Sequence, residues 1–253
     1  GPREVKPGRG PRRPRPRGRA AEPRAIVPGL MTRVYLETYG CQMNEADSEL
    51  MAGVLARAGF ERVADPAEAD VLLLNTCAVR AHAEQRVLGR ITDLARHKQA
   101  RPGVLLGVTG CMAQHLRGRL LAHSRWLDLV IGPDSYRELP ALLERAARQP
   151  VAHAEPDPGE TYGDLEPRRA PGVRAWVPVQ RGCDKFCAYC IVPFTRGRER
   201  SLPLEDVLHG IRRAVAGGCR EVVLLGQTVN SWHDGGRDFA DLLRAARAVE
   251  GLL

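Results

Sequence analysis

The stretch DVLLLNT (residues 70–76), which ends directly before Cys77, indicates the architecture of the first half of the chain. Its Val and Leu residues follow one another without polar alternation, which is typical of a strand buried on both faces of a parallel sheet. Similar strand candidates are RVYLET (33–38), GVLLGVTG (103–110) and LDLVIG (127–132).

A stretch with a helical pattern follows each of these strand candidates. The expected helices are Glu45–Arg57 with Asn44 as its N-cap, His82–Arg96, Ala113–Leu121 and Tyr136–Arg148. A repeated alternation of buried strand and helix is typical of an open α/β sandwich, in which helices cover both faces of a parallel sheet. We therefore expect residues 31–148 to form one α/β domain.

Three cysteines share one position relative to these strands. Cys41, Cys77 and Cys111 each lie just past the end of a successive strand candidate. In open α/β sheets this carboxyl edge is where ligands bind, so the fold is expected to bring the three thiols together. The alternative is that they are three ordinary buried cysteines.

The second half of the chain follows the same pattern on a smaller scale. Residues 149–172 contain Pro and Gly throughout and show no apolar period, so they are expected to form a linker. Beyond them, strands are expected at 173–180 and 221–226, and helices at 204–216 and 238–249. Two strand–helix units can neither close a barrel nor cover both faces of a sheet, so residues 173–253 are expected to be an incomplete domain.

The loop GCDKFCAYCIVP (182–193) carries Cys183, Cys187 and Cys190 within eight residues. A disulfide needs two cysteines and a structural zinc site needs four ligands. Three thiolates suit a four-iron, four-sulfur cluster whose fourth iron stays open. A zinc site completed by Cys219 or His209 is the alternative, and it would make the chain a nucleic-acid-binding module without catalysis.

The charge is concentrated at the start of the chain. Residues 1–30 hold +7 of the net charge of +8, in a tract rich in Pro, Gly and Arg that we expect to be a disordered tail. The first methionine, Met31, stands just before the first strand and is an alternative start. The chain has no apolar run of bilayer length and no secretory signal, so we expect it to be cytoplasmic and not to bind membranes. We also expect a monomer. An odd number of cysteines in such a chain favours metal or redox chemistry over disulfides.

Four motifs resemble those of the methylthiotransferase family within the radical S-adenosylmethionine superfamily. They are TYGCQMNEADSE, NTCAVRAHAEQRVLGRI, GCMAQ and GCDKFCAYCIVPFTRGRERS. The resemblance runs from Arg33 to the last residue. It implies that residues 173–253 form the first part of a partial TIM-type barrel. Gln42, Met43 and Asn44 follow the first cysteine, as in the MiaB-type branch, which acts on tRNA adenosine. The branches that act on ribosomal protein or on threonylcarbamoyl-adenosine carry other residues there and remain alternatives.

The resemblance implies two four-iron, four-sulfur clusters and S-adenosylmethionine as cofactors. Cys183, Cys187 and Cys190 would hold the cluster that cleaves S-adenosylmethionine, with Tyr189 near the adenine. Gln227 follows the strand candidate at 221–226, at the edge of the sheet where ligands bind, so it is a further candidate at the cofactor; the alternative is that it only ends the strand. Cys41, Cys77 and Cys111 would hold a second cluster that binds the sulfur to be inserted.

The implied reaction converts N6-isopentenyladenosine, next to the anticodon of a tRNA, to its 2-methylthio derivative. One S-adenosylmethionine would be the radical source and another the methyl donor. The partners would be the tRNA anticodon loop, an electron donor such as flavodoxin or ferredoxin, and a sulfur source.

Two residues depart from the family pattern. Leu202 stands where Arg is usual, and Gly210 lies in an expected helix where Glu is usual. The second half of the chain holds only two strand–helix units, without the further strands expected to line the cofactor. The chain alone is therefore expected not to complete the reaction.

Overall fold

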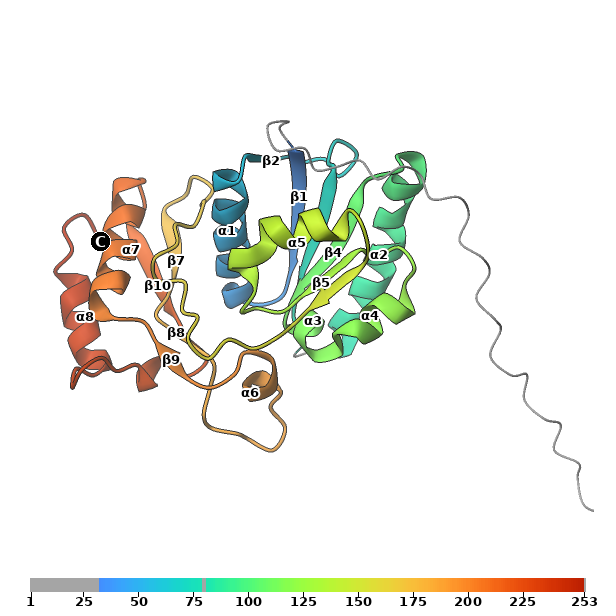
Figure 1. The fold of residues 1–253 in the computed structure, drawn as a ribbon. Coiled ribbons are helices and arrows are strands. Elements are labelled where there is room, and N and C mark those ends of the chain that lie inside the picture. Colours follow the sequence, from blue (N-terminus) through green and yellow to red (C-terminus); the bar gives the residue numbers. More distant parts are fainter. Residues whose placement is uncertain (1–31, 79–80, 253) are drawn as a thin grey trace, which may run out of the picture.

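The computed structural model describes residues 32–78 and 81–252 (Figure 1). The expected tail at 1–30 and the alternative start at Met31 lie outside these residues.

A six-stranded parallel sheet forms the centre of the first half, with strand order β2-β1-β3-β4-β5-β6. The strands are β1 (Thr32–Tyr39), β2 (Phe60–Arg62), β3 (Val71–Thr76), β4 (Leu105–Gly110), β5 (Leu129–Ile131) and β6 (Val151–His153). From β1 the chain continues to β2 on one side, and from β3 it continues to β6 on the other. The direction of winding therefore reverses between β1 and β3, the position at which open α/β sheets bind ligands.

Helices cover both faces of this sheet (Figure 1). One face packs against α1 (Gln42–Arg57), η1 (Tyr136–Glu138) and α5 (Leu139–Ala146), and the other against α2 (Ala81–Ala100), α3 (Cys111–Leu116) and α4 (Gly118–His123). Strand β3 serves both layers: Leu73 joins the core beneath α1 and α5, whereas Leu72 and Leu74 join the core beneath α2. The predicted open α/β sandwich is confirmed.

Three expected helices differ in detail. The helix expected at Tyr136–Arg148 is the 3-10 helix η1 followed by α5, which ends at Ala146. Helix α1 begins at Gln42 with Cys41 as its N-cap, so Asn44 is not the cap but the third residue of the helix. The helix expected at Ala113–Leu121 is two short helices, α3 and α4, because Arg117 between them has a φ of 48°. A left-handed residue ends the α-helical hydrogen-bond pattern.

The segment expected to be a linker, 149–172, is packed against the first half of the chain. Its residues 151–153 form β6, which pairs with β5. Tyr162 is buried and stacks on Tyr136, with ring centroids 5.9 Å apart. The backbone N–H of Arg168 donates to the carbonyl oxygen of Glu49 on α1 at 2.8 Å. A three-residue strand is too short to show an alternating pattern in the sequence, which is why composition alone predicted a linker.

The second half contains the two expected strand–helix units. Strands β7 (Arg174–Pro178) and β10 (Glu221–Leu225) pair in parallel, and β8 (Gln180–Arg181) and β9 (Arg200–Ser201) pair antiparallel. The helical elements are α6 (Val192–Thr195), α7 (Leu204–Ala216), η2 (Val229–Ser231) and α8 (Phe239–Arg247).

Helix α1 connects the two halves. It packs on the six-stranded sheet and also against β7, and its Met43 and Ala46 share a small apolar cluster with Leu225 of β10. Among the described residues, no helix combines the length and the apolar character that a bilayer span requires.

Candidate functional site

The register of the large sheet places the first three cysteines at one edge. Tyr39 of β1 is paired with Thr76 of β3, and Thr76 is paired with Gly110 of β4. Cys77 and Cys111 directly follow the last two of these residues, and Cys41 lies two residues beyond Tyr39. Because neighbouring strands lie about 4.8 Å apart, the three cysteines emerge side by side at the carboxyl edge of the sheet.

Two glycines allow the backbone to approach closely at this edge. A Cβ on Gly40 would lie 3.0 Å from the Cβ of Cys77, closer than side chains normally pack. Gly110 has a φ of +89°, and a Cβ there would overlap the backbone of Thr76. Only glycine meets both the conformational and the spatial demand at position 110.

A buried amide network holds the Cys41 turn against β3. The side-chain nitrogen of Asn44 donates to the side-chain oxygen of Asn75 at 3.1 Å, and that of Asn75 donates to the carbonyl oxygen of Asn44 at 2.7 Å. Asn75 also donates to the Ser48 hydroxyl at 2.9 Å, and the backbone N–H of Cys41 donates to the Asn44 side chain at 3.3 Å. Since Asn44 and Asn75 are fully buried, these bonds satisfy groups that burial would otherwise penalise. The sequence motifs did not predict this role of Asn44 and Asn75.

Cys41 interacts with each of the other two thiols, and the three differ in environment. Cys77 and Cys111 are buried, whereas Cys41 is exposed. A hydrogen bond with Cys77 is the main cause that lowers the pKa of the Cys41 thiol to about 5. Burial raises the pKa of Cys111, which also lies within electrostatic reach of Cys41. The structure therefore brings the predicted first group together, with a thiolate favoured at its exposed member.

The second cysteine group begins just past the end of β8. Gly182 directly follows β8 with a φ of +74°, and a Cβ there would overlap the backbone of Arg198. The Cys183 sulfur lies 3.2 Å from the hydroxyl oxygen of Thr228, and the Thr228 backbone N–H donates to the side-chain oxygen of Gln180 at 3.2 Å. Gln227 adjoins this contact, and its buried side-chain oxygen has no partner among the described residues.

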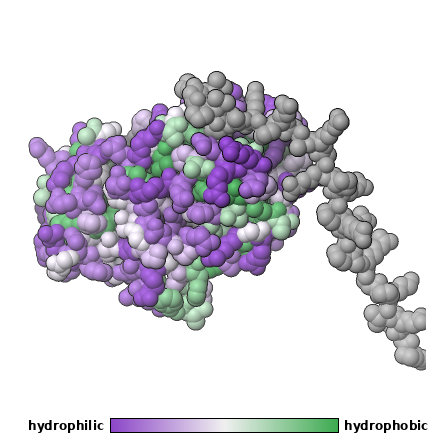
Figure 2. Space-filling view, viewed as in Figure 1, coloured by the Kyte–Doolittle hydropathy of each residue, from purple (hydrophilic) through white to green (hydrophobic). Residues whose placement is uncertain are grey.

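The other loop cysteines are more accessible. Cys187 is exposed and Cys190 is half-buried, and the backbone N–H of Cys190 donates to the carbonyl oxygen of Cys187 at 2.9 Å. The side chain of Tyr189 is 92% exposed. Figure 2 shows hydrophobic surface at the position of α6 in Figure 1, and Phe194 of this helix is among the exposed large hydrophobic residues.

A buried ionic cluster lies between the two cysteine groups. Asp47 of α1 accepts hydrogen bonds from Arg181 at 3.0 Å and from Arg196 at 2.8 Å. The three side chains are at most 5% exposed. Asp47 and Arg196 were not among the residues that the sequence motifs singled out. Their partners are more than 130 residues away along the chain, so no local pattern could have identified them.

The three thiols of the first group form a donor set that fits an iron–sulfur cluster. Within the described ranges, no three His, Cys, Asp or Glu side chains are arranged to hold one metal ion. A four-iron cluster is wider than one ion, so its thiolates do not meet at a point. The three thiols at one edge and the cationic Arg196 beside Cys111 fit such an anionic group.

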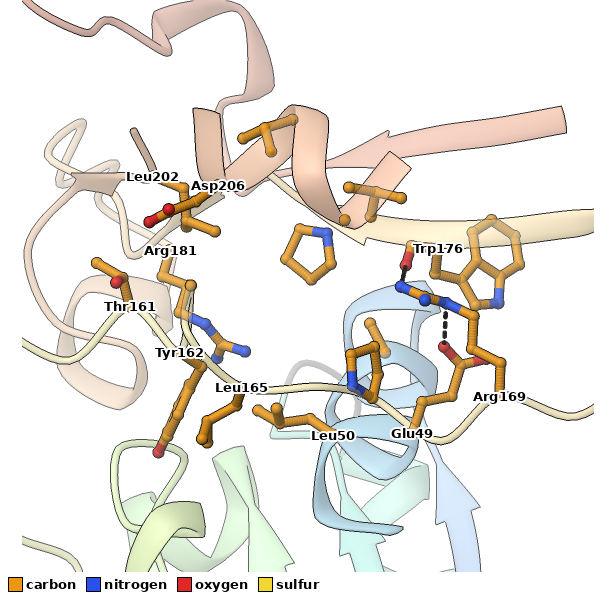
Figure 3. A pocket seen from close by; sticks show the side chains of 17 residues that line it. Glu49, Leu50, Thr161, Tyr162, Leu165, Arg169, Trp176, Arg181, Leu202 and Asp206 are labelled. Carbon is orange, nitrogen blue, oxygen red and sulfur yellow. Dashed lines mark hydrogen bonds and ion pairs between the residues drawn. The ribbon is translucent and has the colours of Figure 1, made fainter. Parts of the chain in front are cut away.

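A separate cavity of about 70 Å³ lies between α1, the segment around Tyr162, β7 and α7 (Figure 3). Glu49 and Arg169 form an ion pair at 3.3 Å on its wall, and burial raises the pKa of Glu49 to about 7. Leu202 and Gly210, the two residues that depart from the family pattern, also line this cavity.

Two family models match the chain. The Uncharacterized protein family UPF0004 matches residues 33–132, and the Radical SAM superfamily matches residues 177–251.

Curated relatives named tRNA-2-methylthio-N(6)-dimethylallyladenosine synthase match most of the chain. The protein from Chloroherpeton thalassium is 46% identical, over 86% of this chain and 49% of the relative. That from Prosthecochloris aestuarii is 46% identical, over 88% and 51%, and that from Anoxybacillus flavithermus is 42% identical, over 83% and 40%. The chain spans about half the length of the first two of these relatives.

Among solved structures, the radical S-adenosylmethionine methyltransferase TsrM from Kitasatospora setae is similar in fold. Its complex with tryptophan and a cofactor analogue gives a TM-score of 0.54 at 14% identity, covering 78% of this chain and 48% of that chain. Its form with cobalamin and a [4Fe-4S] cluster gives the same score and identity, covering 79% and 48%. At this identity the likeness shows the fold alone.

These matches confirm the resemblance that the cysteine motifs predicted. The chain joins a region of the UPF0004 family to a region of the Radical SAM superfamily, and it is a relative of the tRNA-2-methylthio-N(6)-dimethylallyladenosine synthases.

Proposed function

We propose that this chain belongs to a radical S-adenosylmethionine tRNA methylthiotransferase that converts N6-isopentenyladenosine next to the anticodon to its 2-methylthio derivative. The observation that carries the proposal is the pair of cysteine groups, in a chain that is 46% identical to synthases of that name. The first group follows strands of the large parallel sheet, and the second lies in the loop that follows β8.

Each cysteine group is assigned one four-iron, four-sulfur cluster. Cys183, Cys187 and Cys190 would hold one, and Cys41, Cys77 and Cys111 the other. When bound, the loop cluster would supply the electron that cleaves S-adenosylmethionine, and the other would carry the sulfur to be inserted.

The residues around the loop would bind and orient S-adenosylmethionine. Gln227 has a buried side-chain oxygen without a partner among the described residues, and such an acceptor suits the amine of the cofactor. Tyr189 presents an exposed ring that can stack on an adenine. Gln180 fixes the edge where these groups meet, because it accepts from Thr228 and donates to the carbonyl oxygen of Gly182 at 3.1 Å.

The proposed partners are a tRNA anticodon loop, an electron donor such as flavodoxin or ferredoxin, and a sulfur source. An enzyme that acts on a loop base reaches it by splaying the base out of its stack. Residues 31–253 carry a net charge of only +1, so specific shape and stacking contacts must supply most of the RNA affinity of this part. The cytoplasmic location and the monomeric state stay predictions.

A comparison of substrates tests the proposed function. The full-length protein would be incubated anaerobically with S-adenosylmethionine, reductant and sulfide, together with isopentenylated tRNA, threonylcarbamoylated tRNA or ribosomal protein. Mass spectrometry should find the 2-methylthio product on isopentenylated tRNA alone. Product on either of the other substrates would assign the protein to another branch of the family.

A further inference from the structure

One carboxylate of the first half holds both ends of the cysteine loop. Asp47 lies on α1 and is fully buried. Arg181 immediately precedes the loop as the last residue of β8, and Arg196 follows α6 at its other end. Each guanidinium donates to a different oxygen of Asp47, at 3.0 and 2.8 Å. Hydrogen bonds to Asp47 therefore attach the segment that carries Cys183, Cys187 and Cys190 to α1, one before the loop and one after it.

Arg196 also lies near the first cysteine group. Its positive charge acts on the Cys111 thiol, and α6 packs against α3, the helix that Cys111 begins. One of its terminal nitrogens is buried and has no partner within the described residues. A residue of the loop segment thus faces the thiols of the large sheet.

Arg181 provides a natural comparison, because its guanidinium points elsewhere. It lies 4.7 Å from the ring centroid of Tyr162, as a cation–π contact (Figure 3). Arg181 and Arg196 therefore share Asp47 but differ in their second neighbour, an aromatic ring for one and the Cys111 thiol for the other.

The charges of this cluster do not balance. Two guanidinium groups face one carboxylate, which leaves one surplus positive charge where all three side chains are buried. A buried charge without a counter-charge is strongly unfavourable, and removal of one partner from a buried pair is more costly than replacement of the whole pair. The surplus charge favours an anionic sulfur group beside Arg196.

We propose that Asp47 is a positioning residue that docks the cysteine loop onto the large sheet. We also propose that Arg196 places the surplus positive charge of this cluster next to the anionic sulfur group on Cys111 and so stabilises that group. The second role rests on the proposed function, because it needs an iron–sulfur cluster at that group. The first role concerns the protein without iron as well.

Hydrogen–deuterium exchange on the full, metal-free chain tests the docking role. In Asp47→Asn, peptides covering 182–200 should exchange at least about tenfold faster, because both arginines lose their buried counter-charge and one loses its acceptor, whereas β3 and β4 should exchange as in the wild type. Glu205→Gln, which removes an exposed carboxylate paired with Arg212, is the control and should change neither region. Unchanged exchange in the loop of Asp47→Asn would overturn the docking role.

If Asp47→Asn does not fold, Arg181→Met and Arg196→Met replace it in this measurement. Each leaves one arginine paired with Asp47 and so keeps a neutral buried pair. Either variant should speed exchange at its own end of the loop, and wild-type exchange in both variants would overturn the docking role.

The reduction potential of the first cluster tests the role of Arg196. Replacement of Cys183, Cys187 and Cys190 by Ala leaves only the first group to be loaded after anaerobic reconstitution. In this background Arg196→Met should shift the midpoint potential, followed by EPR, to more negative values, because loss of a nearby positive charge disfavours the added electron. Arg181→Met, which removes the same charge at the other position, should shift it less.

Equal shifts in the two variants would overturn the specific role of Arg196. Absence of iron from every reconstituted form would overturn the proposed function and with it the role of Arg196. The exchange experiment uses no iron, so it would still decide the docking role of Asp47.

Discussion

At the level of single residues, the cysteines of one group differ in burial, in pKa and in the groups that they contact. Cys41 is the N-cap of α1, where the backbone N–H groups of Met43 and Asn44 favour a thiolate in addition to the main effect of Cys77. Cys183, just past β8, is buried and contacts Thr228. The spacing of the cysteines predicted which ones form a group, whereas their individual environments depend on residues distant in sequence.

Substitutions in the two groups should separate two activities. In the full-length enzyme, Cys187→Ala should abolish cleavage of S-adenosylmethionine, because only the loop group lies beside Gln227 and Tyr189. Cys77→Ala should spare cleavage and abolish sulfur insertion. Chromatography of 5′-deoxyadenosine and mass spectrometry of the nucleosides measure the two steps. Equal loss of cleavage in both variants would contradict the division of roles.

Glu49 should make stability depend on pH. Burial raises its pKa to about 7 in the folded chain, from an ordinary value of 4.5, despite the opposing effect of Arg169. Between these two values the folded state binds more protons than the unfolded state, so this residue lowers the free energy of unfolding as the pH rises. Glu49→Gln cannot ionise, so its free energy of unfolding should fall less from about pH 5 to about pH 8. Urea unfolding at both pH values measures this, and parallel changes in variant and wild type would refute it.

At the level of elements, long buried strands and amphipathic helices could be predicted, but short elements could not. The sequence predicted α7 with its observed bounds, Leu204–Ala216, because apolar residues recur there with the helical period. Strands β2 and β6 have three residues each and gain their hydrogen bonds only from β1 and β5. The break between α3 and α4 at Arg117 results from a positive φ, which an arginine in the sequence does not predict.

Two glycine substitutions in helices should have opposite effects. Gly210 lies inside α7, and an added Cβ would meet only a methyl group of Val177 at an ordinary 4.0 Å. Gly210→Ala should therefore stabilise the chain by about 1 kcal/mol, because alanine is the better helix former. Gly53 lies inside α1, where an added Cβ would overlap the carbonyl oxygen of Glu166. Gly53→Ala should destabilise by about 1–3 kcal/mol, since α1 or the 161–169 segment must move.

Urea denaturation of both variants at one pH measures these changes in the free energy of unfolding. If Gly53→Ala proved as stabilising as Gly210→Ala, the 161–169 segment would not be packed on α1 as the structure has it.

At the level of the whole molecule, the sequence predicted two sheets but not how they meet. Helix α1 belongs to the large sheet by its chain position, yet Met43, Ala46 and Asp47 contact residues of the second half. Contacts of this kind join residues more than 100 positions apart, so their charge and shape complementarity becomes visible only in the folded chain. The interface nevertheless brings Arg196, from the loop segment, to the first cysteine group.

The iron content of the reconstituted chain tests the central claim most directly. Anaerobic reconstitution followed by iron and sulfide analysis, Mössbauer and EPR spectroscopy should give about eight iron atoms per chain in two four-iron clusters. Replacement of Cys41, Cys77 and Cys111 together by Ala should leave about four, and replacement of Cys183, Cys187 and Cys190 should also leave about four. A colourless protein that contains zinc instead of iron would contradict the account.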